Sequence, residues 1–471
     1  MFSPSRQSRG GHLRILIYYD ALFKGLKTWR TILSLLSRCS RSASAAPKNL
    51  VDTERLLGAL GPAMLPADTV AQADLALINT CGFIQPAVEE SVAAILDAVR
   101  DADETRESTG RRPLVAVAGC LVSRYGQDLR EELPEVDLWL STDQLHLWPV
   151  MIAQAITHAR PIPNAPRRLS TGPAYAYLKI SEGCSHNCHF CTIPSIRGPH
   201  RSRPVEALLD EARTLAASVP EIIIVGQDST SYGSDLGGDN TIKHLVSGLA
   251  DLPGLAWLRL MYLYPAGLTD DLLGFLKSIG DPLLPYFDIP LQHAHPDVLA
   301  SMGRPFARNP RKVIDRVRAH FSDAALRTTF IVGYPGETDE HFDHLMRFVE
   351  ETRFHHLGVF PYWPEDGTPA AALPDPVDDQ TKLDRRDALM ALQADISREI
   401  MESHVGQTLP VLIEAPSPEW PGLFTGRTWF QAPEVDGTTY VSTPPDTTLT
   451  PGTIVTIEID KADTYDLSGL V

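Results

Sequence analysis

The pattern of apolar and polar positions predicts alternating strands and helices from residue 51 onward. Residues 74–79 and 114–118 form short apolar runs that are typical of buried strands. Residues 85–100 and 124–132, which follow these runs, have the spacing of helices. Because alternating strands and helices favour a parallel sheet with helices on its faces, we expect an α/β domain over residues 47–160.

A second segment, residues 167–402, repeats this alternation six times after a proline-rich linker. Its predicted strands are Tyr177–Ile180, Glu221–Val225, Trp257–Tyr262, Pro285–Ile289, Thr328–Val332 and His356–Phe360. Helical patterns lie between them, which predicts a partial barrel of six β/α units. In such barrels, the side chains that carry the chemistry lie at the carboxyl ends of the strands.

The last part of the chain, residues 405–471, changes character after a long predicted helix over residues 380–404. Short strand-like runs alternate there with turns rich in Pro and Gly, which predicts a small β-barrel. The expected fold class is therefore α/β, with an N-terminal parallel-sheet domain, a partial (βα)6 barrel and a small C-terminal β-barrel.

Composition and charge narrow the classes of function. No apolar run reaches the roughly 18 residues that span a membrane. The net charge of −17 argues against binding nucleic acid by bulk attraction. The six cysteines in 471 residues do not form a disulfide framework, and three of them lie within eight residues. This grouping favours a metal site in a reducing compartment, so we expect a cytoplasmic protein.

The beginning of the chain differs from the rest in charge. Residues 1–48 carry a net charge of +8, and the remainder carries −25. This stretch is rich in Ser and Arg, and it lacks the apolar segment of a secretory signal. We therefore expect residues 1–46 to be an atypical basic leader, either disordered or a mis-assigned start of the chain.

The densest chemical signal is the run from Gly183 to Cys191. Cys184, Cys188 and Cys191 have the spacing C-x3-C-x2-C and directly follow the first predicted strand of the barrel. Three thiolates on one short loop can hold three irons of a [4Fe–4S] cluster and leave the fourth iron open. The alternative is a zinc site completed by His186 or His189.

This spacing after the first strand of a six-unit barrel resembles the radical S-adenosylmethionine superfamily, and Phe190 matches the aromatic residue usual before the third cysteine. The resemblance implies that the open iron binds the amino and carboxylate groups of S-adenosylmethionine. It also implies that an electron from the cluster cleaves this molecule to a 5′-deoxyadenosyl radical.

The resemblance extends over the chain from residue 47. Residues 47–54, 79–83 and 118–120 resemble the N-terminal domain of the methylthiotransferases, and residues 406–471 resemble their TRAM barrel. Several strings are closer to the RimO branch of that family: residues 193–198, 288–294, 432–437 and 465–467. That branch implies transfer of a methylthio group to the β-carbon of an aspartate in small-subunit ribosomal protein number twelve.

The alternative substrate in this family is a tRNA adenosine. Residues 405–471 carry a net charge of −7, which disfavours RNA and favours a basic protein partner. We therefore expect the ribosomal protein as partner, on or near the small ribosomal subunit. An electron donor is also expected, and neither a membrane nor strong bulk binding of nucleic acid.

A second [4Fe–4S] cluster is implied by the resemblance, on three cysteines of the N-terminal domain. Cys81 and Cys120 match two of them, but Ala46 stands at the third position, where it cannot bind iron. Cys39 lies seven residues upstream as a substitute. Either residues 1–46 are a mis-assigned start, or the chain is a variant with a damaged second site that binds the ribosome but is catalytically impaired.

Residues at the ends of barrel strands are expected to contact S-adenosylmethionine. A glycine at such a place lets a ligand approach the backbone closely, and residues 331–337 resemble the adenine-contacting segment of the superfamily. The expected contacts are Gly226, Gln227, Arg259, Gln292, Gly333 and Pro335. Tyr262, Tyr264 and His293 could line the same cavity.

Overall fold

The chain divides into two units, Met1–Ser170 and Thr171–Val471. The structure is a computed structural model, and it describes residues 13–19, 47–61, 64–156, 160–163, 165–306, 309–445 and 447–471. Among these residues, no helix is long and apolar enough to cross a membrane.

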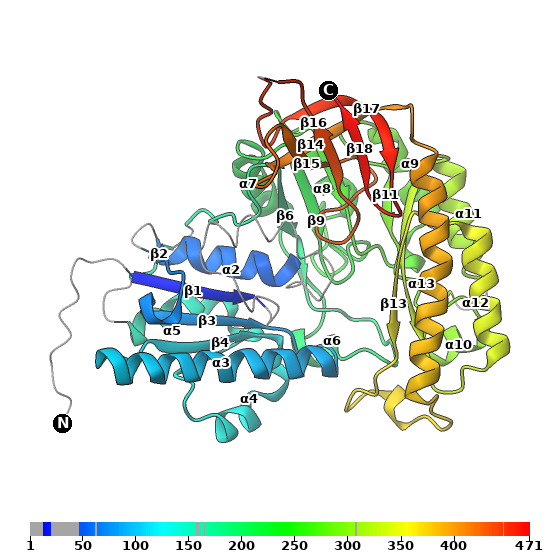
Figure 1. The fold of residues 1–471 in the computed structure, drawn as a ribbon. Helices are drawn as coiled ribbons and strands as arrows, with labels where there is room; N and C mark the ends of the chain where they lie inside the picture. The colour runs from blue at the N-terminus through cyan, green and yellow to red at the C-terminus, as the bar shows by residue number, and fades with distance from the viewer. Residues whose placement is uncertain are drawn as a thin grey trace. The chain divides into compact units, whose positions relative to one another are not determined.

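The first unit is built on a parallel sheet of five strands in the order β2-β1-β3-β4-β5 (Figure 1). The strands are β1 (Leu13–Tyr19), β2 (Met64–Pro66), β3 (Leu75–Thr80), β4 (Leu114–Gly119) and β5 (Leu138–Ser141). The helices are α2 (Pro47–Leu60), α3 (Gln85–Thr109), α4 (Cys120–Glu132) and α5 (Trp148–Ala155), with short 3-10 turns at Val70–Gln72 and Thr142–Leu147.

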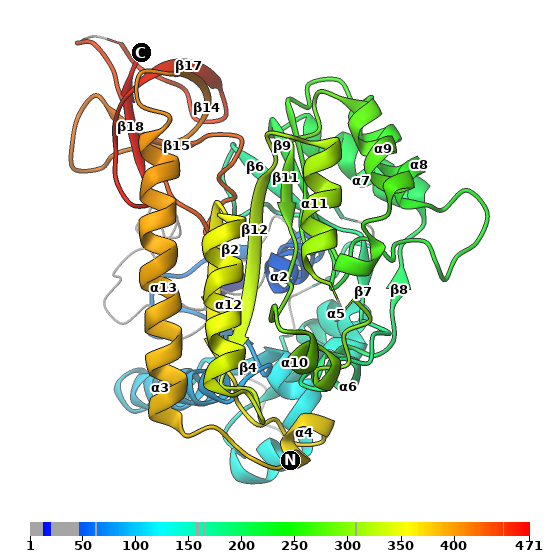
Figure 2. The ribbon, with the colours of Figure 1, turned by 90° about the vertical axis from the view of Figure 1, so that its right-hand side faces the viewer.

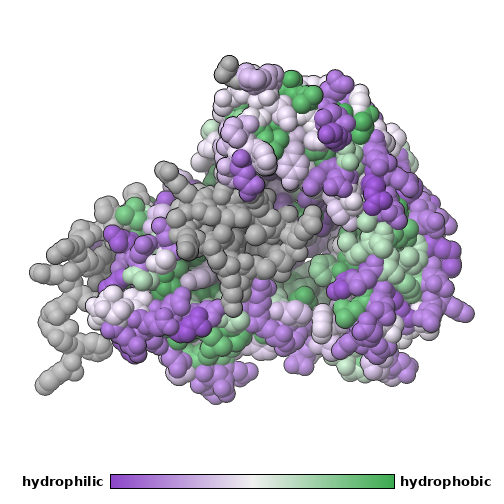
Figure 3. Space-filling model, viewed as in Figure 1, coloured by the Kyte–Doolittle hydropathy of each residue, from purple (hydrophilic) through white to green (hydrophobic). Residues whose placement is uncertain are grey.

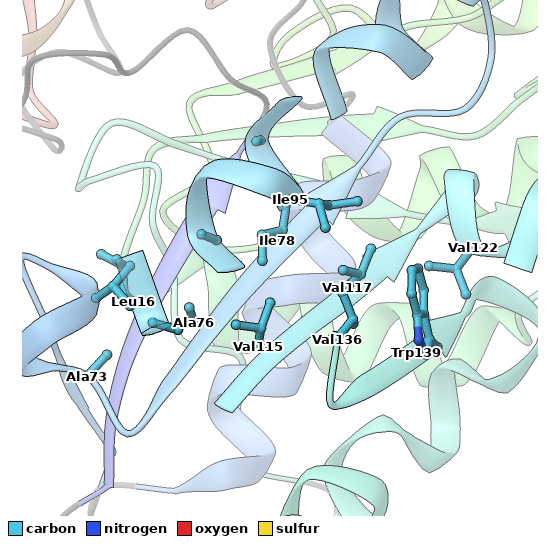
Figure 4. Close-up of a cluster of buried hydrophobic side chains, with 14 of the residues drawn as sticks. Leu16, Ala73, Ala76, Ile78, Ile95, Val115, Val117, Val122, Val136 and Trp139 are labelled. Carbon is cyan, nitrogen blue, oxygen red and sulfur yellow. The ribbon is translucent and has the colours of Figure 1, made fainter. Parts of the chain in front are cut away.

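The core of this unit explains why β3 and β4 are continuous apolar runs. Every residue of β3 is buried, as expected for a strand covered on both faces. Ile78, Val117 and Ile95 belong to one cluster of buried side chains in which the strands meet α3 (Figure 4). Helices pack on the sheet because their apolar sides have no other surface to cover.

Strand β1 corrects the expectation for residues 1–46. Leu13–Tyr19 pairs in parallel with β3, with Tyr19 opposite Asn79, and also with β2. This stretch is therefore a central strand of the first unit and not part of a leader outside the fold. The remaining residues of 1–46 lie outside the described part of the chain.

The second unit begins with six parallel strands, as predicted. They form two three-stranded sheets, β10-β9-β6 and β11-β12-β13, and a parallel bridge joins Leu258 of β10 to Leu283, in the segment that leads into β11. The strands are β6 (Tyr175–Lys179), β9 (Glu221–Val225), β10 (Trp257–Leu260), β11 (Tyr286–Asp288), β12 (Ala325–Val332) and β13 (His356–Pro361). The predicted partial barrel is confirmed.

Helices alternate with these strands and cover the outside of the partial barrel (Figure 2). They are α6 (Ile193–Arg197), α7 (Val205–Ala216), α8 (Ile242–Ala250), α9 (Asp270–Ile279), α10 (Pro296–Ser301), α11 (Arg311–His320) and α12 (Asp339–Thr352), and two short strands, β7 (Ser181–Glu182) and β8 (Arg201–Ser202), also occur. Hydrophilic side chains dominate the right-hand edge of Figure 3, where α11 and α12 lie in Figure 1. The apolar side of α12, with Leu345, Phe348 and Val349, is buried.

A long helix, α13 (Asp379–Glu402), leads from the partial barrel into the C-terminal domain and lies beside α12 (Figure 2). The domain is a closed barrel of five strands in the order β14-β15-β16-β18-β17. Its strands are β14 (Thr408–Pro416), β15 (Leu423–Arg427), β16 (Thr439–Ser442), β17 (Ile454–Ala462) and β18 (Leu467–Leu470). The predicted small β-barrel is confirmed.

Candidate functional site

The three-cysteine loop follows β6 and β7 and ends at α6. Gly183 begins it with a φ of 71°, and a Cβ there would lie 2.2 Å from the carbonyl oxygen of Pro199. Only glycine fits this turn. The backbone N–H of Cys184 donates to the carbonyl of Gly198 at 3.1 Å, which closes the loop. The thiols of Cys184, Cys188 and Cys191 are free and partly exposed.

The two histidines of the loop bind residues outside it. Nε2 of His186 lies 2.7 Å from Oδ2 of the buried Asp228, and its ring stacks on Tyr264 with centroids 3.7 Å apart. Nδ1 of His189 lies 2.7 Å from the carbonyl oxygen of Ser301. Both imidazoles are thus held by neighbouring strand ends and helices, which does not favour the zinc alternative.

The donor set fits an iron–sulfur cluster. Burial raises the pKa of Cys184, and it raises the pKa of Cys191 to about 12. Iron binding must therefore displace protons from these thiols. The guanidinium of Arg304 lies beside the same loop, with Nη1 3.2 Å from Sγ of Cys188. Three thiols with an adjacent cation suit a group that is bound through thiolates.

The end of β9 brings Gly226, Gln227 and Asp228 next to this loop. A Cβ on Gly226 would lie 2.7 Å from Oγ of Ser181, so the backbone passes close to β7. Nε2 of Gln227 donates to Oε1 of Glu182 at 3.0 Å. The neighbour of Gly226 is thus the side chain of Ser181, and the expected contact of Gly226 with S-adenosylmethionine stays a prediction.

Glu182 is the centre of a small ion cluster beside the first cysteine. It pairs with Lys179 and with Nη1 of Arg197, the latter at 2.7 Å. Burial alone would raise the pKa of this carboxyl, but the two cations outweigh burial and hold the pKa below its usual range. The side chain stays ionised, and it fixes Gln227 at the edge of the loop.

The backbone is strained at two residues that follow β10 and β11. Tyr262 has a φ of 60° and Gln292 a φ of 73°. This region is costly for residues other than glycine, by about 1–3 kcal/mol each, and such strain gathers at functional sites. The backbone of Gln292 is held by the carbonyl of Thr329 at 2.8 Å and by the N–H of Ile331 at 2.7 Å.

The segment after β12 contains the predicted Gly333 and the half-buried Pro335. Gly333 has a φ of 72°, and a Cβ there would lie 2.1 Å from Cγ of Lys382 on α13. Its N–H donates to Oε2 of Glu337 at 3.0 Å. Arg385 on α13 donates to Oε1 of Glu337 at 2.9 Å, so α13 fixes the shape of this segment.

Arg259 does not join these residues, contrary to expectation. Its side chain is fully buried, with Nε donating to Oε1 of Glu221 at 2.8 Å and Nη1 to the carbonyl of Trp429 at 2.9 Å. These partners give it a structural role toward the C-terminal barrel. The position of Arg259 on a strand did not predict that its side chain binds Glu221 and the C-terminal barrel.

In the first unit, Cys81 and Cys120 lie at the same edge of the sheet. Thr80, the last residue of β3, pairs with Gly119, the last residue of β4, and each cysteine comes next in the chain. A Cβ on Gly82 would lie 2.8 Å from the backbone nitrogen of Leu121, so the two segments are in close contact. Cys39 and Ala46 lie outside the described residues.

Three contributors to the site were missed in the sequence: Arg304, Glu337 and Arg385. Arg304 lines a cavity of about 490 Å³ and contacts Cys188, far away in the chain. Glu337 lay inside the string 331–337, but its bond to Gly333 depends on the turn that the segment makes. No local pattern marks Arg385, because its role follows from how α13 packs.

Three family models match the chain. The Radical SAM superfamily matches residues 178–349, the TRAM domain residues 405–471, and Uncharacterized protein family UPF0004 residues 46–141. With the cysteine loop at the strand ends, these matches define a radical S-adenosylmethionine enzyme with a TRAM domain.

Curated relatives narrow this class. The chain is 58% identical over 427 residues to "Ribosomal protein uS12 methylthiotransferase RimO" of Nitratidesulfovibrio vulgaris (strain DP4), which covers 90% of this chain and 97% of the relative. The protein of the same name from Aquifex aeolicus is 42% identical, over 90% of this chain and 94% of the relative. The chain belongs to the ribosomal protein uS12 methylthiotransferase RimO family, which confirms the resemblance seen in the motifs.

A solved structure of the cobalamin-dependent S-adenosylmethionine radical enzyme OxsB, with aqua-cobalamin bound, shares the fold. The TM-score is 0.52 at 12% identity, over 81% of this chain and 56% of that chain.

Proposed function

We propose that this protein transfers a methylthio group to the β-carbon of an aspartate in ribosomal protein uS12. The observation that carries the proposal is the three-cysteine loop at the carboxyl ends of the barrel strands, where Gly226, Gln292 and Gly333 also follow strands. In the overall reaction the hydrogen atom of the aspartate β-carbon would leave in 5′-deoxyadenosine, formed from one S-adenosylmethionine. A bond to the sulfur of a methylthio group, whose methyl would come from a second S-adenosylmethionine, would replace the carbon–hydrogen bond. Its formation would release one electron, which offsets the electron consumed by the cleavage.

Cys184, Cys188 and Cys191 would hold the [4Fe–4S] cluster. When bound, the cluster supplies the electron that cleaves S-adenosylmethionine to a 5′-deoxyadenosyl radical. The tethers of His186 to Asp228 and of His189 to Ser301 keep the loop in one conformation. Such outer contacts of a metal site orient its ligands.

The strand ends would receive S-adenosylmethionine. Gln227 presents its side chain from the end of β9, and Gln292 holds a strained backbone that is fixed on both sides. Gly333 and Pro335 form a turn that Glu337 and Arg385 brace. These groups are positioned before any ligand arrives, so binding does not have to order them.

Cys81 and Cys120 would hold a second [4Fe–4S] cluster that carries the sulfur. Their common edge of the sheet and the contact of Gly82 with Leu121 support this assignment. The third ligand would come from the part of the chain outside the described residues. Because two clusters hold about eight irons and one holds about four, the iron content of the reconstituted chain tests this part.

The substrate surface would be the acidic C-terminal barrel. Residues 405–471 carry a net charge of −7, which attracts a basic protein by long-range electrostatics. We therefore place the reaction on or near the small ribosomal subunit in the cytoplasm, with an electron donor still to be identified.

The decisive experiment incubates the anaerobically reconstituted chain with S-adenosylmethionine, a chemical reductant and purified uS12. Mass spectrometry of uS12 should show one methylthio group in place of a hydrogen on an aspartate. Cys184→Ala should form neither this product nor 5′-deoxyadenosine. Transfer to purified tRNA but not to uS12 would replace this proposal with the tRNA alternative. Cleavage without transfer, at about four irons per chain, would indicate an impaired variant.

A further inference from the structure

Arg304 has an unusual set of partners for a buried cation. The residue is 5% exposed. Its Nη1 lies 3.2 Å from Sγ of Cys188, and its Nη2 donates to the carbonyl of Pro290 at 2.6 Å. The guanidinium carbon lies 4.6 Å from the ring centroid of Tyr264 and 4.9 Å from that of Phe306. Within the described residues, none of its contacts is with a carboxylate.

The sulfur of Cys188 is therefore the site where this charge is balanced. Elsewhere in the second unit, buried cations face carboxylates, as Arg259 and Arg427 face Glu221. A buried guanidinium without an anionic partner is costly, because the low-polarity interior does not replace lost hydration. A thiolate bound to iron supplies the missing negative charge, which explains why the cation is placed there.

A cation in this place acts on the electron affinity of the cluster. Reduction adds one negative charge, and a nearby positive charge in a medium of low polarity stabilises the reduced form more than the oxidised form. Hydrogen bonds to the sulfurs of a cluster also raise its reduction potential, as the nearby positive charge does. Arg304 supplies both the positive charge and the hydrogen bond, and both act at Cys188.

We propose that Arg304 is a positioning residue that raises the reduction potential of the cluster held by Cys188 and its two neighbours. The inference rests on the proposed function, since it requires that the loop holds this cluster. Arg304 makes the cluster easier to reduce by its electron donor. Arg304 also binds the carbonyl of Pro290, so the segment that leads to Gln292 is connected through Arg304 to the sulfur of Cys188.

The test compares three variants of the full chain, reconstituted with iron. Arg304→Met keeps an apolar stem against the rings of Tyr264 and Phe306 and removes the charge. Arg304→Lys keeps the positive charge but lacks the planar guanidinium group. Arg316→Met is the matched control, because Arg316 lines the same cavity but binds the carbonyl of Leu268 and Asp270 instead of a thiol.

The readout is the ratio of reduced to oxidised cluster at a fixed potential. It is measured from the electron paramagnetic resonance signal that changes when S-adenosylmethionine is added, since that change marks the barrel cluster. We expect Arg304→Met to lower this ratio about ten-fold, equivalent to about 59 mV for a one-electron couple. Arg304→Lys should recover most of the loss, and Arg316→Met should match the native chain.

An unchanged ratio in Arg304→Met overturns the inference, and so does an equal loss in Arg304→Met and Arg304→Lys, because charge would then not be the cause. If Arg304→Met takes up no iron, Arg304→Gln replaces it, and a ratio equal to that of Arg304→Lys overturns the inference. If the native chain has no signal that responds to S-adenosylmethionine, the proposed function fails instead.

Discussion

Nη2 of Arg427 on β15 donates to Oε2 of Glu221 on β9 at 2.7 Å, and both side chains are almost completely buried. Oε1 of the same carboxylate accepts from Nε of Arg259 on β10 at 2.8 Å. Burial would raise the pKa of Glu221, but the two guanidinium groups outweigh burial and lower it. One ionised carboxylate thus joins the partial barrel to the C-terminal barrel.

Glu221→Gln should destabilise the second unit strongly. The variant leaves two buried guanidinium groups facing a neutral amide, and breaking a buried ion pair by removing one partner costs about 3–5 kcal/mol. Thermal unfolding should show this as a lower midpoint. Asp395→Asn removes the carboxylate of an exposed pair with Arg398 and should have a much smaller effect. Equal midpoints for the two variants would contradict the prediction.

Asp228→Asn should weaken the hold on the cysteine loop. Asp228 accepts from Thr230 and Ser231 and faces His186. An amide cannot accept all of these bonds. Loss of the side chains that orient the ligands of a metal site lowers metal affinity about 10–100-fold. The rate at which a chelator removes cluster absorbance should rise accordingly. The exposed Asp239→Asn serves as control, and a rate for Asp228→Asn no higher than the control's would refute this role.

Gly333→Ala should weaken binding of S-adenosylmethionine. The new Cβ would lie 2.1 Å from Cγ of Lys382, and the φ of 72° is itself unfavourable for alanine. Gly336→Ala has a similar φ of 80° but no atom within 4 Å of the new Cβ, so it isolates the effect of strain.

Adding Lys382→Ala to Gly333→Ala should restore part of the affinity, because it removes Cγ and Cδ of Lys382, at 2.1 and 3.1 Å from the new Cβ, and leaves only the Cβ of residue 382 at 3.0 Å. Equilibrium binding of S-adenosylmethionine to the reconstituted variants measures both steps. If the double variant binds no better than Gly333→Ala, the contact with Lys382 is not the cause.

The stability of the second unit should fall as the pH drops below 6.5, and His355 should account for part of the fall. Burial, and then repulsion from His356 and His404, lower the pKa of His355 from 6.5 to about 3. Above pH 6.5 the side chain is neutral in both the folded and unfolded states. Between pH 6.5 and 3 only the unfolded chain binds the proton, which costs up to about 1.4 kcal/mol per pH unit.

His355→Gln should therefore reduce the difference in stability between pH 7 and pH 5.5, measured by urea unfolding. The other titrating groups are present in both proteins, so the comparison measures the loss of His355 together with its repulsion from His356 and His404. The same dependence in His355→Gln and the native chain would rule out this assignment.

Ala46→Cys should raise the iron content of the reconstituted chain toward about eight per chain, the content of two [4Fe–4S] clusters. Helix α2 begins at Pro47, and Nδ2 of Asn79 donates to the carbonyl of Asn49 at 3.0 Å, two residues before Cys81. The first turn of α2 thus contacts the end of β3, directly before Cys81. Ser44→Cys is the control, and equal iron content in both variants would speak against a role for position 46.

The sequence predicted most of the fold because the strands are buried on both faces. Strands such as β3 and β9 are buried along their whole length and read as apolar runs, which burial requires of a parallel sheet. Strand β1 was not predicted, because its apolar run lies within a basic, serine-rich stretch whose composition is typical of disorder.

The cysteine loop was predicted from spacing alone, whereas its surroundings were not. Arg304 reaches Cys188 across more than a hundred residues of chain, and no local pattern encodes such a contact. Arg259 shows the opposite failure, since its place on a barrel strand was right and its partners were wrong. Positions along a chain predict elements well, but the partner of a buried charge depends on packing between distant elements.

The pairing of Thr80 with Gly119 has a consequence for how the first unit can change in evolution. The distance between Cys81 and Cys120 is inherited from the spacing of neighbouring strands and not from the length of chain between them. Helix α3, which connects the two strands over 25 residues, is therefore a spacer. It can gain or lose whole turns at its far end while the two thiols keep their separation, because that separation does not depend on the length of the connection.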